Sequence, residues 1–180
     1  MNRRLEPEVS AADHLRGSLA APSRLVIYGD YECPYTRQAL ISVARVRKEL
    51  GDSLVFVFRN FPLTEIHPHA LHAALAAEGA DAQGKFWEMH DLLFRRQNFL
   101  ADQELVAYAG LIGLDQERFR ADLEARTGLA RIEADLQSGE RSGVDGTPGI
   151  FVNGRRHLQD YDPKTLAAAL TAAAAPGRPR

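Results

Sequence analysis

Apolar and polar positions alternate with two different periods along this chain, and these periods predict its first elements. A short apolar run at 25–28, bounded by turn residues, is typical of a buried strand. A second run at 54–58 is rich in β-branched and aromatic residues and predicts another strand. Between them, apolar positions recur at helical spacing from residue 37 to Leu50-Gly51, where the helix should end. Strand, helix and strand at this spacing predict a parallel βαβ unit with a right-handed crossover.

The middle of the chain has helical periodicity, and the last part returns to strand and turn signals. Asn153-Gly154 between the apolar run 150–152 and the segment 155–158 (Arg-Arg-His-Leu) predicts a hairpin, because Asn-Gly favours a type I′ turn. The Gly-rich segment 143–149 breaks the helical pattern before it. The expected helices are an Ala-rich helix at 68–78, a helix around 86–93, helices capped by Asp102 and Asp115, a fifth at 129–136 and a last one at 164–173.

The predicted order is therefore β-α-β, a helical insertion, and β-β-α. Without the insertion, this is a four-stranded mixed sheet with helices on both faces, which is the thioredoxin arrangement. We expect an α/β, thioredoxin-like fold with an α-helical insertion between its βαβ and ββα halves. The expected parts are an N-terminal arm at 1–20, the thioredoxin-like domain at 21–65 and 141–173, the inserted helical subdomain at 66–140 and a disordered tail at 174–180.

Composition and charge narrow the classes of function. The chain has 180 residues, 45% of them apolar, which is enough to bury a core. The formal net charge of −2 gives no sign of electrostatic binding to nucleic acid or anionic lipid. No apolar stretch is long enough to span a bilayer, and the basic start lacks the apolar run of a signal peptide. We expect a cytoplasmic location as written, or a periplasmic or extracytoplasmic one if a leader or an attached membrane domain was removed.

Cys33 is the single cysteine of the chain, so no internal disulfide can form. It lies between the first predicted strand and the first predicted helix. The first N–H groups of a helix carry partial positive charge, which favours a thiolate over a thiol, and the thiolate is the nucleophile. Pro34 suits the first helical position. The polar neighbours of Cys33 predict that this residue is accessible and reactive. The alternative is a buried structural cysteine.

Four segments, in order and at suitable spacing, resemble the DsbA-like branch of thioredoxin-fold proteins. The resemblance covers roughly residues 14–170. It implies that Pro148 is cis and faces Cys33, and that Tyr35, Thr147 and Pro148 contact the substrate. The segments are 30–36 (Asp-Tyr-Glu-Cys-Pro-Tyr-Thr), 59–63 (Arg-Asn-Phe-Pro-Leu) with 67–70 (His-Pro-His-Ala), 86–91 (Phe-Trp-Glu-Met-His-Asp) and 143–154 (Gly-Val-Asp-Gly-Thr-Pro-Gly-Ile-Phe-Val-Asn-Gly).

Thr36 departs from that pattern, because dithiol members have their resolving cysteine at this position. The resemblance then implies a thiol–disulfide oxidoreductase that works through Cys33 alone, with Pro34 and Thr36 completing the catalytic set. Thr36 would hydrogen-bond the thiolate. Protein disulfides or glutathione are the expected partners. We expect no bound cofactor and no metal, with glutathione as a candidate co-substrate.

Several alternatives stay open at this stage. One is a glutathione-dependent transferase or isomerase, and another is a redox-inactive thioredoxin-fold module that binds a partner. A cluster of His67, His69 and His72 raises the hypothesis of a metal site, although no second cluster of ligands accompanies it. A Cys–His hydrolase is a further hypothesis.

Overall fold

The computed structural model describes residues 4–174 and shows a mixed α/β fold with a five-stranded sheet of order β1-β3-β2-β4-β5. The described residues form two compact units: unit 1 comprises 4–28, 35–59 and 138–174, and unit 2 comprises 29–34 and 60–137. The elements are β1 His14–Arg16, β2 Ser23–Gly29, α1 Pro34–Leu50, the 3₁₀ turn Gly51–Ser53, β3 Leu54–Asn60, α2 Ala70–Asp81, α3 Phe86–Arg95, α4 Asp102–Leu111, α5 Gln116–Ala125, α6 Leu129–Arg141, β4 Gly149–Val152, β5 Arg155–Arg156 and α7 Pro163–Ala174.

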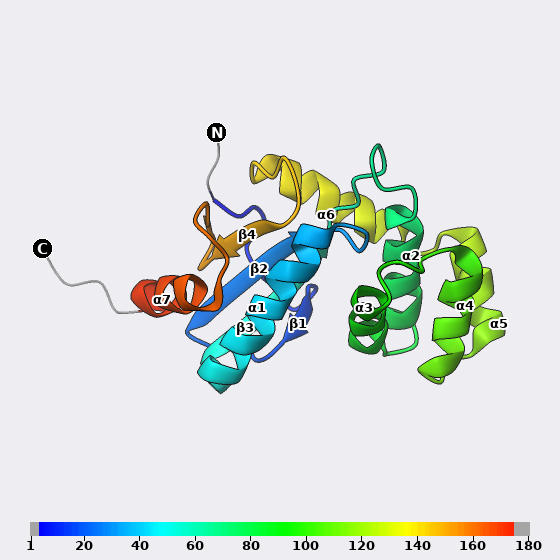
Figure 1. The fold of residues 1–180 in the computed structure, drawn as a ribbon, viewed down its shortest axis with the longest axis horizontal. Helices are drawn as coiled ribbons and strands as arrows, with labels where there is room; N and C mark the ends of the chain where they lie inside the picture. Colours follow the sequence, from blue (N-terminus) through cyan, green and yellow to red (C-terminus); the bar gives the residue numbers. More distant parts are fainter. Residues whose placement is uncertain (1–3, 175–180) are drawn as a thin grey trace, which may run out of the picture. The chain divides into compact units, whose positions relative to one another are not determined.

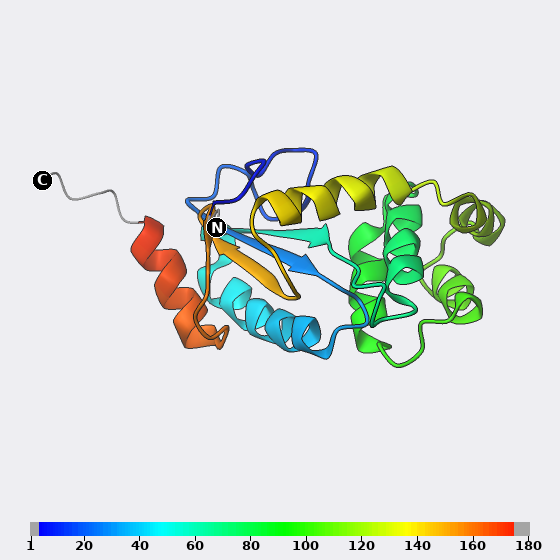
Figure 2. The same ribbon diagram turned by 90° about the horizontal axis from the view of Figure 1, so that it is seen from above.

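The sheet of unit 1 has the expected topology. The arrows of β2 and β3 point in the same direction, and α1 runs along one face of the sheet between them in sequence (Figure 2). β4 pairs antiparallel with β2, with Ile27 opposite Ile150, and β5 pairs antiparallel with β4. Asn153 and Gly154 both have positive φ, +46° and +76°, as a type I′ turn requires. The thioredoxin-like fold with a helical insertion is confirmed.

Burial along α1 explains how the helix packs. Its buried side chains are Thr36, Ala39, Val43 and Val46, which are spaced by three or four residues and so form one stripe. The central strands β2 and β3 are buried along almost their whole length, which is typical of strands covered on both faces.

The N-terminal segment contains a strand that the sequence pattern did not predict. β1 pairs antiparallel with β3 at the sheet edge and has three residues, too few for an alternating pattern to stand out. The sheet therefore has five strands, not the four expected. Residues 175–180, most of the predicted disordered tail, lie outside the described residues.

Arg59 on β3 anchors this N-terminal segment. Its side chain is 2% exposed, and its Nε and Nη2 donate to the Asp13 carboxylate at 2.8 and 3.2 Å. Nη1 donates to the Tyr28 hydroxyl at 2.8 Å and to the Pro7 carbonyl at 3.1 Å, and Nη2 also reaches the Glu8 carbonyl at 3.4 Å. Burial by itself lowers the pKa of Arg59, but the bonds to Asp13 and Tyr28 reverse the effect and the pKa is raised. The guanidinium therefore stays charged with every N–H group bonded.

Unit 2 is a helical unit in which α2 contacts α3, α4 and α5 (Figure 1). Six of the alanines of α2 are buried, which lets neighbouring helices approach closely. α5 begins as predicted, because Asp115 is its N-cap and accepts a bond from the Arg118 N–H at 3.0 Å. Asp102, by contrast, is the first residue of α4, after the N-cap Ala101. Between residues 4 and 174, no helix combines the length and apolar character that a bilayer span requires.

We predict that Arg59→Met destabilises unit 1 by about 3–5 kcal/mol, because it leaves the buried Asp13 carboxylate without its cation. Urea unfolding measures the change in the free energy of unfolding. Asp13→Asn should cost much less in the Arg59→Met background than in the wild type. Strictly additive costs would contradict the coupling, and Arg45→Gln on the exposed face of α1 is the control for loss of one positive charge.

Candidate functional site

Cys33 directly precedes α1, in the position where an N-cap residue stands, and Pro34 is the first helical residue. The turn before it is closed by Asp30. The Asp30 carbonyl accepts from the Cys33 N–H at 3.2 Å, and its Oδ1 accepts from the Glu32 N–H at 2.7 Å. Its other carboxylate oxygen accepts from the Leu63 N–H at 2.8 Å. One carboxylate thus fixes the segment that carries the thiol within unit 2.

Gln97, in the segment after α3, holds the same turn from a second side. Its Nε2 donates to the carbonyls of Tyr31 and Cys33, both at 2.9 Å. Nothing in the sequence pattern marked Gln97, since an amide after a helix has no special spacing. One general signal remains: the carbonyl groups of a turn outside helices and strands need hydrogen-bond donors from elsewhere in the chain when the turn is buried.

Aromatic packing in unit 2 fixes the side chain of Tyr31, two residues before the cysteine. The Tyr31 hydroxyl lies 3.1 Å from His90 Nδ1, and its ring lies 4.8 Å from that of Phe94, centroid to centroid. The His90 ring also meets Phe86 and Trp87, at 5.8 and 5.0 Å between centroids. The segment 86–91 therefore contributes a buried support for the turn.

The prediction that Cys33 is exposed is wrong: the residue is 4% exposed. Polar neighbours of a residue do not have to contact solvent. Asp30 is itself 1% exposed, and Thr36 is fully buried. The polar groups of the turn are satisfied by hydrogen bonds inside the protein, so they do not need water.

The three clustered histidines bind three separate carboxylates of unit 2. His67 Nδ1 lies 2.8 Å from Asp30, and His69 Nδ1 lies 3.1 Å from Glu32. The backbone N–H of His69 also donates to Glu32, at 2.7 Å. His72 Nδ1 lies 2.6 Å from Asp102. Two of the three histidines therefore support the acidic residues on either side of Tyr31, and the geometry gives each histidine its own partner.

The remaining predicted site residues belong to unit 1. Tyr35 is 60% exposed, and Thr36 is buried within the first turn of α1. The Thr147–Pro148 peptide bond is cis, directly before β4. Both residues are partly exposed.

A surface pocket of about 460 Å³ lies beside the thiol segment, within unit 2. Its lining includes Glu32, His69, Pro34 and Gln97. Glu32 and Pro34 are the residues directly before and after Cys33, so the pocket adjoins both neighbours of the cysteine in the sequence. The segment 98–101 and Glu104 complete the lining, and the Phe99 side chain there is 59% exposed. An exposed aromatic ring beside a pocket is a common feature of binding surfaces.

Unit 2 contains a second polar cluster that no sequence pattern indicated. Asn60 Nδ2 donates to Glu78 at 2.7 Å and to Asp135 at 3.3 Å, and the Asn60 N–H donates to Asp135 at 2.9 Å. Burial raises the pKa of Asp135 and nearby Glu78 adds to the rise, while Arg131 and the Asn60 N–H act against it. Two carboxylates thus share one buried amide.

Comparison with known proteins identifies the class. The sequence profile of the family described as thioredoxin matches residues 10–172. The fold resembles oxidised BdbD from Bacillus subtilis, with a TM-score of 0.84 at 21% identity, covering 97% of this chain and 99% of that one. It also resembles a thioredoxin-like oxidoreductase from Silicibacter pomeroyi, with a TM-score of 0.81 at 25% identity, covering 91% and 93% of the two chains.

The chain therefore belongs to the thioredoxin family, and its structural neighbours are DsbA-like. It is also 46% identical over 168 residues to a protein of Salinispora arenicola named Na(+)/H(+) antiporter NhaA 1, covering 93% of this chain and 26% of the relative. The chain spans about a quarter of the length of the curated relatives it matches.

We predict that Gln97→Ala loosens the turn at Cys33. Two carbonyls lose a donor, so unit 2 should lose roughly 1–3 kcal/mol of stability. The thiol should react faster with iodoacetamide, because the turn opens more often. Gln103→Ala, at an exposed position of α4, is the matched control. An unchanged alkylation rate in Gln97→Ala would show that the two hydrogen bonds from Gln97 do not govern access to the sulfur.

A pH dependence follows from Asp135. Because burial raises its pKa in the folded state, there is a pH range in which the native protein binds a proton at Asp135 that the unfolded chain has already released. This contribution to stability is present at low pH and is lost as the pH rises from the ordinary aspartate value through the raised one. Asp135→Asn should remove that decline from the curve of unfolding free energy against pH, whereas Glu133→Gln, at an exposed position, should keep it. Equal slopes in wild type and Asp135→Asn would contradict the assignment.

Proposed function

We propose that this domain is a thiol–disulfide oxidoreductase that works through Cys33 alone. The Cys33 thiolate attacks one sulfur of a disulfide, a mixed disulfide forms, and the second sulfur leaves as a thiolate that takes up a proton. An outside thiol, from glutathione or a protein, then attacks the mixed disulfide and releases Cys33. Each step exchanges one S–S bond for another, so no further oxidant or reductant is needed.

The position of Cys33 directly before α1, in a chain of the thioredoxin family, is the observation that carries this proposal. The free N–H groups of the first helical turn favour negative charge on a group placed there. Pro34 and Tyr35, the next two residues, are exposed and offer a surface to a substrate. Thr36 replaces a resolving cysteine, and its hydroxyl would hydrogen-bond the sulfur. The cis Thr147–Pro148 loop is proposed to present backbone to the substrate, as the family resemblance implies.

A second candidate is a module that binds a partner without redox chemistry. Two observations favour it: Cys33 is 4% exposed, and the matched relatives named as antiporters are about four times longer than this chain. In this hypothesis the domain works as a part of a larger membrane protein, and the fold serves recognition. Both candidates agree on the fold and differ on the need for the sulfur.

We predict that the protein treated with oxidised glutathione gains one glutathione per chain, that Cys33→Ser gains none, and that an added thiol removes the adduct. Intact-protein mass spectrometry measures all three. A short peptide with the same residues 30–36 is the control, because its thiol is fully accessible. A folded protein that stays unmodified while the peptide reacts would refute the monothiol mechanism and favour the binding module.

Thr36→Cys provides the matched test of resolution. It restores two cysteines separated by two residues, so an internal disulfide should replace the stable glutathione adduct. The reduction of a disulfide substrate should then no longer require glutathione in the resolving step. Persistence of the glutathione adduct in Thr36→Cys would contradict the assigned role of position 36.

A further inference from the structure

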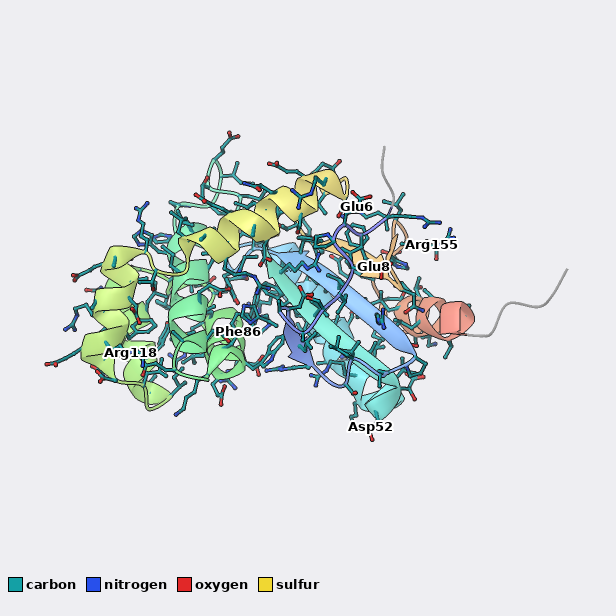
Figure 3. All side chains as sticks on the ribbon, turned by 180° about the vertical axis from the view of Figure 1, so that it is seen from behind. Glu6, Glu8, Asp52, Phe86, Arg118 and Arg155 are labelled. Carbon is teal, nitrogen blue, oxygen red and sulfur yellow. The ribbon has the colours of Figure 1, made fainter. Side chains whose placement is uncertain are left out.

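A second pocket, in unit 1, is lined by three arginines, and Cys33 is not among its lining residues. It measures about 460 Å³, within the usual range for small-molecule sites. Three segments far apart in sequence form it: the N-terminal stretch that ends at Val9, the chain entering β2, and the β4–β5 turn. Its charged lining residues are Arg4, Arg24, Arg155 and Glu8. In Figure 3, Glu8 and Arg155 are labelled on two of these segments.

The backbone places these arginines firmly. Arg4 and Arg155 are directly opposite each other in an antiparallel bridge, and the Leu5 N–H donates to the Gly154 carbonyl at 2.9 Å. Like charges at opposed positions of paired strands are unfavourable. The pocket lining brings these two arginines together with Arg24, and Glu8 is the single carboxylate among the described lining residues, so the lining has an excess of positive charge.

Asn153 gives independent evidence that the pocket binds a hydrogen-bond acceptor. Its Oδ1 accepts from the Arg24 N–H at 2.6 Å, and its own N–H donates to the Arg24 carbonyl at 2.8 Å. The amide cannot be turned over without losing that acceptor. Its Nδ2 therefore has a fixed direction, is buried, and has no hydrogen-bond partner in the described chain. A buried donor without an acceptor is costly, so an acceptor from a ligand is expected there.

We propose that this pocket binds a phosphate group, carried by a small phosphorylated molecule or by an anionic lipid headgroup. Arginine forks match the geometry of phosphate oxygens, and the Asn153 amide supplies a neutral donor at the edge of the same site. The pocket is much larger than one phosphate, which leaves room for the group that carries it. The net charge of −2 concealed this site, because three cations gathered by the fold do not show in a sum over the whole chain.

The test is a titration of the full chain with inorganic phosphate and glycerol 3-phosphate, followed by the backbone amide NMR signals of residues 153–155, which every variant retains, and in the wild type also by the Asn153 side-chain amide. We expect saturable shifts, and roughly tenfold weaker binding for Arg24→Gln and Asn153→Asp. Asn153→Asp keeps the acceptor for Arg24, tolerates the positive φ and removes the donor. Arg155→Gln, at an exposed position, should weaken binding without endangering the fold.

Arg45→Gln on α1 removes the same charge away from the pocket and should bind like the wild type. Vesicles of phosphatidylcholine with and without phosphatidylglycerol distinguish the sources. Binding that depends on phosphatidylglycerol, without binding of the soluble phosphates, identifies a lipid headgroup, and the reverse result identifies a soluble phosphate. Failure of both arms, or equal weakening by Arg45→Gln and Arg24→Gln, would overturn the proposal.

Discussion

The buried guanidinium of Arg59 is the interaction on which the organisation of unit 1 depends. A charged group that is 2% exposed must find a partner for every N–H, and β2 supplies only the Tyr28 hydroxyl. The N-terminal segment supplies the rest, through the Asp13 carboxylate and the carbonyls of Pro7 and Glu8. The segment is therefore part of the fold, since without it Arg59 would be buried and unpaired. The arginine-lined pocket depends on the same interaction, because part of its lining comes from the N-terminal segment that Arg59 holds in place.

The turn before α1 shows the same principle at the thiol. Asp30 and Gln97 use their polar atoms on the backbone around Cys33, so the position of the cysteine is fixed through its own backbone and that of its neighbours. Rigid placement and low exposure come together here, because the same bonds that fix the turn also close it. A reaction at Cys33 then requires a partner that supplies the free energy to open the turn, or a contact that engages the exposed Tyr35 first.

Sequence patterns predicted the elements with strong periodicity and failed where partners come from far away. The βαβ unit, the helical insertion and the Asn153-Gly154 turn all follow from local spacing, and the structure has them. β1 was missed because its three residues depend on pairing with β3 and on the contact of Asp13 with Arg59, 46 positions away. Gln97, Asn60 and Asp135 were missed for the same reason. The accessibility of Cys33 was wrong because hydrogen bonds, not polarity, decide which polar groups can be buried.

Thr36 joins these observations into a functional argument. In a dithiol site the thiol that resolves the mixed disulfide belongs to the same chain, so the site can function with little access for solvent molecules. In a monothiol site a second molecule must reach the same sulfur. A cysteine that is 4% exposed is therefore better suited to a few partners that bind next to it than to free exchange with every thiol. The pocket lined by Glu32, Pro34 and Gln97 lies where such a partner would bind. Selectivity by adjacent binding is thus the property that both proposed functions share, and the reactivity of the sulfur separates them.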